Sequence, residues 1–326
     1  MSIMLLSTIT MAGFAQHKLV KSFPIKSPGG WDYIAVNDGK IYASHGTQVN
    51  ILDEKTGDSL GFIPNTTGVH GVAFDNKMNR GYTSNGRTNN VTVFNLTTNE
   101  KIMNIATGKN PDAITFDKES NRIITCNGGS KDLSIIDPKT NTVIATIALD
   151  AKPEEGHGDG EGKFYVNLED KSEIAVIDLK DNKVINHFSL KPGDAPTGLA
   201  VDTKRKRLYS TCSDSKTLVV LDMNTGKFIE KVPIGEGCDG LSFDPKKDML
   251  YASCGEGVIT AIKIISANEF KVEQTIKTKP SARTITIDTK SHMLFLPAAE
   301  IKPADPKDKN ARRQMVPGTF QILVVE

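Results

Sequence analysis

The chain has 326 residues, of which 38% are apolar and 24% are charged, and its 40 basic residues almost cancel its 39 acidic ones. This length and composition predict a folded protein with a sizeable core. The near-neutral balance excludes attraction to nucleic acid or to an anionic membrane surface by net charge alone.

In chain order, the first predicted element is a signal peptide at residues 1–15. Residues 3–15 are apolar or small and end in Gly13-Phe14-Ala15, which places small residues at positions −3 and −1 before a cleavage site. The basic residues that normally precede such a stretch are missing, so the peptide is interpreted as truncated at its start. The alternative is an apolar strand or helix. We expect an exported protein, periplasmic or extracellular, with no transmembrane segment, because no other stretch approaches the roughly 20 apolar residues of a membrane span.

The rest of the chain repeats one pattern at intervals of about 40 residues. Each copy holds a strand such as 71–75, a second such as 207–211, a third such as 218–222, and a fourth after a Thr-Gly or Thr-Asn turn. Alternating apolar residues and frequent β-branched residues predict strands, and no helical period occurs. The seven copies open at Asp32, His70, Asp112, Glu154, Thr197, Asp239 and Arg283. Four strands in a repeat of this length predict an all-β, seven-bladed propeller with antiparallel blades.

The two ends of the repeat region complement each other. The seventh copy stops after its third strand, at 320–325, and a spare strand at 18–25 precedes the first copy. Placing the spare strand on the outer edge of the last blade closes the ring and removes an exposed edge. Residues 18–326 are therefore predicted to form a single propeller domain.

These repeats resemble those of the YVTN-repeat (YncE-like) seven-bladed propeller family. The resemblance rests on the D-x-x-T-G/N turns and on the closing segments 283–288, 294–300 and 316–325, and it covers residues 18–326. It implies an exported and mostly bacterial protein without an assigned reaction. The family is similar in turn to quinoprotein dehydrogenases and lactonase-like propellers, but no set of catalytic positions is carried over to this chain.

The seven opening residues are predicted to ring one mouth of the central channel. The ligand candidates among them are Asp32, His70, Asp112, Glu154, Asp239 and Arg283, and the metal candidates are Asp32, Asp112, Glu154 and Asp239. Their carboxylates favour a divalent cation such as Ca²⁺ or Mg²⁺, and the histidine allows a transition metal. The alternative is that they only cap turns in a water-filled channel. The ends of the second strands are expected nearby, at His45, Asn85, Asn127, Asn167, Cys212, Cys254 and Glu300.

Blade four is irregular over residues 154–162, where glycines and charged residues replace apolar ones. His157, Asp159 and Glu161 would share one face of an extended strand and could hold a metal. For Asp159 and Glu161 we favour the plain alternative of a hairpin turn, whereas His157 remains a candidate. A polar segment at 300–318 interrupts blade seven on the mouth face, with a local charge of +2 from five basic and three acidic residues. It is interpreted either as a lid over the mouth or as a solvated flap.

The four cysteines lack the CxxC spacing of a zinc ribbon or a thioredoxin site. Cys238 and Cys254 are predicted to lie almost opposite each other in blade six, so a disulfide between them is one hypothesis. Cys212 is the rival partner, and Cys126 is expected to stay free.

Two functions follow from this organisation. The first is a monomeric, extracytoplasmic binding or scaffold protein that holds a small molecule or a protein at the channel mouth. The second is a lactonase or lyase in which a divalent cation polarises a carbonyl and His70 or His157 acts as the base. The chain has no G-x-S-x-G, P-loop or H-E-x-x-H motif. A quinoprotein is expected to stack its cofactor on tryptophan, and the chain has a single tryptophan, Trp31, so a quinoprotein is not expected.

Overall fold

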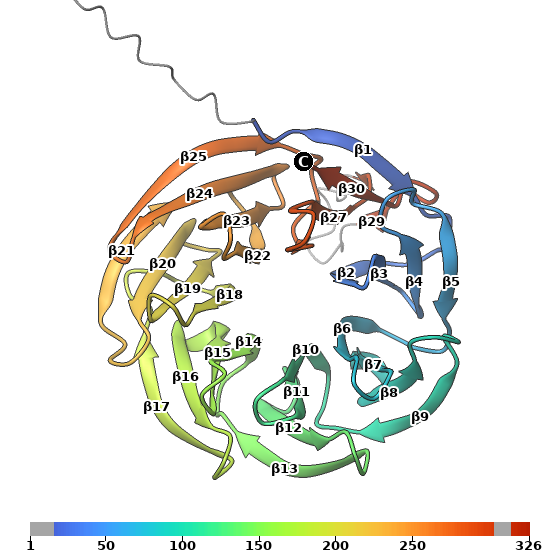
Figure 1. Cartoon of the computed structure of the whole chain (residues 1–326), viewed down its shortest axis with the longest axis horizontal. Coiled ribbons are helices and arrows are strands. Elements are labelled where there is room, and N and C mark those ends of the chain that lie inside the picture. Colours follow the sequence, from blue (N-terminus) through green and yellow to red (C-terminus); the bar gives the residue numbers. More distant parts are fainter. Residues whose placement is uncertain (1–15, 303–313) are drawn as a thin grey trace, which may run out of the picture.

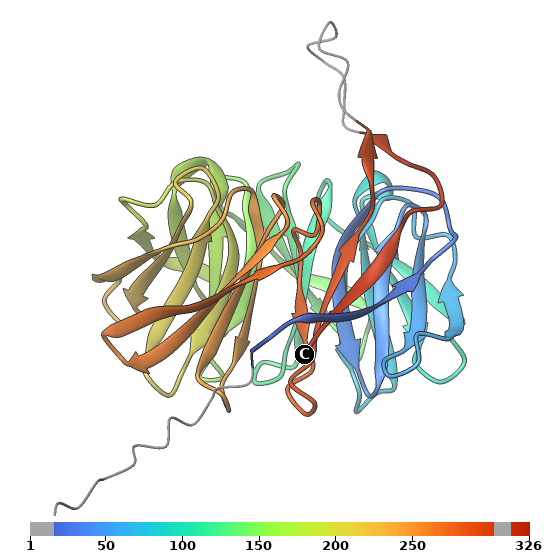
Figure 2. The same cartoon turned by 90° about the horizontal axis from the view of Figure 1, so that it is seen from above.

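Seven four-stranded antiparallel sheets surround a central channel, as Figure 1 shows down the channel axis and Figure 2 from the side. This computed structural model describes residues 16–302 and 314–326. In blades one to six, four consecutive strands pair in chain order. The prediction of a seven-bladed all-β propeller is confirmed. The predicted signal peptide at 1–15 lies outside the described residues, as does the stretch 303–313 of the predicted loop.

The strands fall into four rings around the channel. The innermost strands are β2 (Trp31–Asn37), β6 (Val69–Asp75), β10 (Pro111–Asp117), β14 (Pro153–Gly158), β18 (Pro196–Asp202), β22 (Cys238–Asp244) and β26 (Thr286–Ile287). The second strands are β3 (Lys40–His45), β7 (Arg80–Asn85), β11 (Arg122–Asn127), β15 (Lys163–Leu168), β19 (Arg207–Cys212), β23 (Met249–Cys254) and β27 (Leu294–Ala298).

The two outer rings complete the blades. The third strands are β4 (Gln48–Asp53), β8 (Asn90–Asn95), β12 (Asp132–Asp137), β16 (Glu173–Asp178), β20 (Thr217–Asp222), β24 (Val258–Ser266) and β30 (Gln321–Val325). The outermost strands are β5 (Ser59–Ile63), β9 (Lys101–Ala106), β13 (Thr142–Ala148), β17 (Lys183–Ser189), β21 (Phe228–Pro233), β25 (Glu269–Lys277) and β1 (Leu19–Pro24). Two one-turn helices, η1 (Gly86–Thr88) and η2 (Glu169–Lys171), and the short hairpin of β28 (Ile301–Lys302) and β29 (Gln314–Met315) lie between them.

The core lies between neighbouring blades and is built from the second and third strands. One aromatic position recurs in the second strands and is almost fully buried, at Tyr42, Tyr82, Tyr165, Tyr209, Tyr251 and Phe295. Blade three has Ile124 there instead. Burying a large apolar side chain contributes roughly 1.5–3 kcal/mol. This position therefore supplies much of the attraction that holds adjacent blades together.

Aspartate ends nearly every innermost strand because the following turn needs a hydrogen-bond acceptor. The Asp75 carboxylate accepts hydrogen bonds from the backbone amides of Lys77 and Met78, at 3.0 and 3.2 Å. Asp244 does the same for Lys246 and Lys247. An Asx turn of this kind satisfies amides that the sheet leaves free, so these recurring aspartates are structural.

The N-terminal strand closes the ring as predicted. β1 pairs antiparallel with β30, from Leu19 opposite Val325 to Pro24 opposite Gln321. Its Phe23 side chain is 5% exposed and packs over Gly57 of blade one. A Cβ atom on Gly57 would lie 2.0 Å from the Phe23 ring, and the residue has a φ of +76°, so this turn requires glycine.

The disulfide between Cys238 and Cys254 is not formed. The two residues lie directly opposite each other in β22 and β23, as predicted. All four cysteines are nevertheless buried free thiols. Each thiol of the pair instead contacts a carbonyl of its own strand at 3.6 Å, Gly240 for Cys238 and Ala252 for Cys254. The predicted bridge is therefore wrong, and the pair behaves as the small apolar residues that buried cysteines resemble.

Deleting residues 18–25 should lower the unfolding temperature and broaden the transition, because the outer edge of blade seven becomes unpaired. Phe23→Ala alone should cost about 3–5 kcal/mol, the usual range for truncating a buried phenylalanine. Val20→Ala, on the exposed face of the same strand, is the matched control and should change little. Scanning calorimetry measures all three. A deletion variant that unfolds like the parent would contradict closure by β1.

Candidate functional site

The seven predicted mouth residues occupy equivalent positions in their blades. In blades one to six each is the second residue of its innermost strand, and in blade seven Arg283 lies shortly before β26. The pairing of the innermost with the second strand shifts register directly beyond this residue in blades one to six, as between Trp31 and Ile34. Such bulges re-aim side chains. The repeated bulge thus re-aims one residue in each of blades one to six.

Three of the predicted residues meet closely enough to share one ligand. The Nδ1 atom of His70 lies 2.5 Å from Asp32 Oδ2 and 3.5 Å from Asp112 Oδ1. Candidate ligand atoms of these residues all lie within 4.8 Å of one another. Burial alone would lower the pKa of His70, but its hydrogen bond to Asp32 and the charge of Asp112 outweigh this and raise it. The imidazole between the two carboxylates therefore keeps its proton to a higher pH than a free imidazole does.

The carboxylates of this mouth are crowded and poorly solvated. Burial and the nearby charge of Asp32 raise the pKa of Asp112 to about 6. Burial and Asp112 raise the pKa of Glu154 to about 8, although the Lys152 ammonium lies 2.6 Å from the Glu154 carboxylate and opposes the shift. Lys152, which sequence reasoning missed, also pairs with Glu169. The positive charge nearby is too small to offset burial and repulsion, so these carboxyl groups ionise at a higher pH than usual.

Arg283 supplies the other positive charge at the mouth. Its guanidinium bonds to Asp239 and lies 3.3 Å from Asp32 Oδ1. Asp239 is therefore engaged by an ion pair within the ring. Thr197 is buried and donates a hydrogen bond to the Cys238 carbonyl at 3.0 Å, which is a structural contact. The ring thus divides into the close group of Asp32, His70 and Asp112 and flanking pairs centred on Arg283 and Lys152.

The ends of the second strands do not join the mouth as expected. His45, Asn85, Asn127 and Asn167 are fully buried. The Asn85 amide donates to Asn90 and Thr92, each at 2.8 Å, within its own blade. Cys212 and Cys254 are buried as well, and Glu300 lies beyond the end of β27. The reason is the pleat, because the last residue of a second strand points between blades instead of into the channel.

The irregular stretch of blade four does not gather its three predicted residues. Asp159 accepts hydrogen bonds from the amides of Glu161 and Lys163, as in the hairpin interpretation. Glu161 is an exposed partner of Lys206 at 2.8 Å. His157 turns into the channel, where its Nε2 atom lies 3.0 Å from Glu155 Oε1. The metal site proposed for these three residues is therefore not formed.

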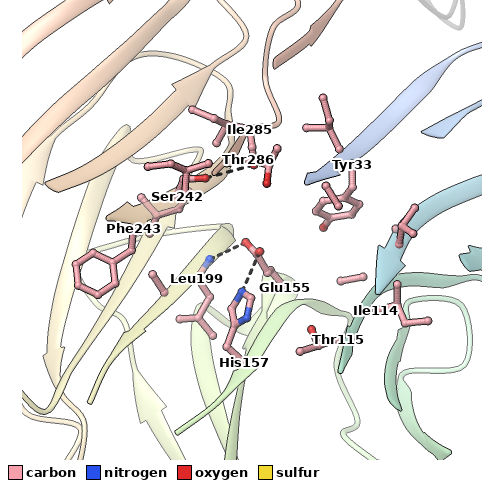
Figure 3. Close-up of a pocket in the computed structure, with 18 of the residues that line it drawn as sticks. Tyr33, Ile114, Thr115, Glu155, His157, Leu199, Ser242, Phe243, Ile285 and Thr286 are labelled. Atoms are coloured by element: carbon pink, nitrogen blue, oxygen red, sulfur yellow. Dashed lines mark hydrogen bonds and ion pairs between the residues drawn. The ribbon is translucent and has the colours of Figure 1, made fainter. Parts of the chain in front are cut away.

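Below the mouth lies a chamber of about 440 Å³, lined by the innermost strands of all seven blades. Figure 3 shows Glu155, His157 and Tyr33 in this chamber. The other oxygen of Glu155, Oε2, accepts a hydrogen bond from the Leu199 amide at 2.9 Å. Burial and the charges of Asp112 and Glu154 raise the pKa of Tyr33, so its hydroxyl stays protonated. Sequence reasoning missed Tyr33 and Glu155, although both occupy a position where most blades have a small residue.

The segment 300–318 leaves the body on the mouth face. Its described ends pair as β28 and β29, with Ile301 opposite Met315, and this hairpin rises above the ring in Figure 2. The two interpretations of this segment, a lid or a flap, concern residues outside those described. Within the described ranges, no helix is long and apolar enough to cross a membrane.

Stability should fall as pH rises from about 5 to about 8.5. The native state holds protons on Asp112 and Glu154 above the ordinary carboxyl pKa near 4. The unfolded chain therefore binds fewer protons in this window, and unfolding becomes easier with rising pH. His70 acts in the same sense, because stabilisation from a raised histidine pKa is lost as pH rises through it.

Asp112→Asn and Glu154→Gln should each flatten this pH dependence. At the alkaline end, each should raise the free energy of unfolding by an amount on the order of 1–2 kcal/mol. Asp214→Asn, at an exposed aspartate, is the control and should leave the slope unchanged. Urea unfolding at several fixed pH values gives the comparison. Parallel curves for the parent and both ring variants would show that these carboxyls have ordinary pKa values.

Comparison with known proteins agrees with this architecture. The model of the YNCE-like beta-propeller family matches residues 72–297. No curated protein matches the chain in sequence. Among solved structures, the chain is similar to Kuenenia stuttgartiensis hydrazine synthase, with a TM-score of 0.73 and 13% identity, over 94% of this chain and 100% of that one. It is also similar to the WD40 repeats of RRP9, with a TM-score of 0.77 and 8% identity, over 94% and 97%.

Identities this low show a shared fold and nothing about activity. The family match, by contrast, spans well over half of the chain. The repeats, the closed ring and this match together lead to one conclusion: the protein is a member of the YNCE-like β-propeller family.

Proposed function

We propose that this propeller is an exported, monomeric binding protein that holds a positively charged ligand at the channel mouth. The observation that carries the proposal is the convergence of Asp32, His70 and Asp112, whose ligand atoms lie within 4.8 Å of one another. Rigid propellers commonly serve as platforms, with function determined by the residues at one site. Export rests on the predicted signal peptide at 1–15 and on the family resemblance.

The charges around the mouth favour a cation. Asp112 and Glu154 have raised pKa values because they are buried near other carboxylates. A bound cation would relieve this repulsion and release protons. The close group offers one imidazole nitrogen and two carboxylates, a donor set that suits Zn²⁺ or Mn²⁺ better than Ca²⁺, which takes six or more oxygens.

Protons and metal would compete for this group. The Nδ1 atom of His70 faces both Asp32 and Asp112, so the same atom carries the proton or the metal. Metal affinity should therefore rise with pH, as it does wherever a ligand atom must lose its proton. Arg283 and Lys152 would remain as fixed positive charges beside the ion.

Titration calorimetry with Zn²⁺, Mn²⁺ and Ca²⁺ at about pH 6 and pH 8 tests the proposal. One site is expected, tighter at the higher pH, with protons released on binding. Asp32→Asn/Asp112→Asn should weaken it at least a hundredfold, since two direct ligands are changed and the loss of even an outer-shell partner costs about 10–100-fold. Asp150→Asn/Asp214→Asn, which removes two exposed carboxylates, keeps the net charge matched and should bind as the parent does. Equal affinity in both double variants would move the site away from the ring.

The alternative function is a metal-assisted lactonase or lyase. His70 Nδ1 faces both Asp32 and Asp112 and would bind the metal, so of the two predicted bases only His157, oriented by Glu155 at 3.0 Å, remains available. A histidine held by a carboxylate is a common form of general base. A lactone panel, measured with added metal and with chelator, tests this reading. Metal-dependent turnover that disappears in His157→Gln would favour the enzyme over the binding protein.

A further inference from the structure

The chamber below the mouth is hollow because small side chains surround it. The residue three positions after each mouth residue is small in six blades. These residues are Ala35, Ala73, Thr115, Ala200, Ser242 and Thr286. The equivalent residue of blade four is His157. One residue past the mouth position, the side chains are again small in five blades, at Gly71, Ala113, Gly198, Gly240 and Thr284. The exceptions are Tyr33 and Glu155.

Three large polar side chains therefore project into a space that all other blades leave open. They come from two blades, β2 for Tyr33 and β14 for Glu155 and His157, and Figure 3 shows them approaching the same region. A water-filled structural channel does not require this asymmetry. We propose that the chamber is a binding site for a small organic cation, a protonated amine with a short apolar body, and that it is distinct from the metal group at the mouth.

Glu155 is the group that would recognise the ammonium. Its carboxylate is held rigidly, with Oε2 bonded to the Leu199 amide and Oε1 to His157. These two contacts leave lone pairs on both oxygens for a ligand. A hydrogen bond between ions in a poorly solvated site is among the strongest that proteins form.

Tyr33 provides a second polar contact. Its hydroxyl has no hydrogen-bond partner within residues 16–302 and 314–326, and its side chain packs against the core cluster of blades three and four. The ring is thus fixed while the hydroxyl remains available to a ligand. Asp32, Asp112 and Glu154 all act on Tyr33 electrostatically, so the field in this part of the channel favours a positive charge.

The size and the walls of the chamber set the rest of the ligand. A volume of about 440 Å³ lies near the lower end of the roughly 300–1,000 Å³ of small-molecule sites. Small apolar residues, among them Ala35, Ala113 and Ala200, are part of the lining. This combination suits one ring or a short alkyl chain that carries a single amine.

Benzylamine, butylamine and the neutral isostere benzyl alcohol are suitable probes, measured by calorimetry and by saturation-transfer NMR. The two amines should bind, and benzyl alcohol should bind about tenfold more weakly or worse. Glu155→Gln should remove this preference for charge. Tyr33→Phe should cause a smaller loss. Glu119→Gln, at an exposed glutamate, is the charge-matched control and should bind the amines as the parent does.

Ala35→Leu offers a second route, since it fills the chamber without changing a polar group. It should abolish amine binding while circular dichroism and the metal titration stay unchanged. Asp32→Asn/Asp112→Asn should weaken metal binding at least a hundredfold but retain most of the amine affinity, which separates the two sites. No amine binding up to about 10 mM, equal binding of benzylamine and benzyl alcohol, or full affinity in Glu155→Gln would each overturn the proposal, whatever the metal does.

Discussion

The convergence of seven strands on one axis is the constraint on which the rest of this structure depends. Equivalent residues of different blades share the same small space at the channel, although they are about 40 residues apart in the chain. The shared space makes Asp32, His70 and Asp112 neighbours. Closure of the ring by β1 and β30 maintains the convergence, since it pairs the last edge strand that would otherwise be open.

This convergence brings several carboxylates close together, and the positive side chains of the ring neutralise them only in part. Arg283 bonds to two aspartates, Lys152 to Glu154, and His70 lies between Asp32 and Asp112. Burial and, after it, the neighbouring carboxylates still raise the pKa values of Asp112 and Glu154. A propeller could avoid the problem with threonine at every mouth position, as blade five does with Thr197. Retaining these carboxylates is consistent with the proposed role of the mouth as a cation site.

The same convergence leaves the chamber open, because the side chains that meet there are mostly small. Seven equivalent side chains would fill the channel if all were large, so most blades carry alanine, glycine, serine or threonine there. Blade four departs from its repeat in sequence and supplies Glu155 and His157, while blade one supplies Tyr33. A departure from the repeat is thus informative, because the fold tolerates a large residue at only a few of these positions.

Sequence alone determined the seven blades, the pairing of residues 18–25 with the last blade and the identity of the mouth residues, because each follows from a period and from alternation that local chemistry enforces. Tertiary structure decided the rest. It made Asp239 a partner of Arg283, buried His45 and Asn85 between blades and left Cys238 and Cys254 unbridged. It also joined Tyr33 to Glu155 in one chamber. Distances across the channel depend on how far each strand twists and bulges, and side-chain direction there is set by packing between blades, which no single repeat encodes.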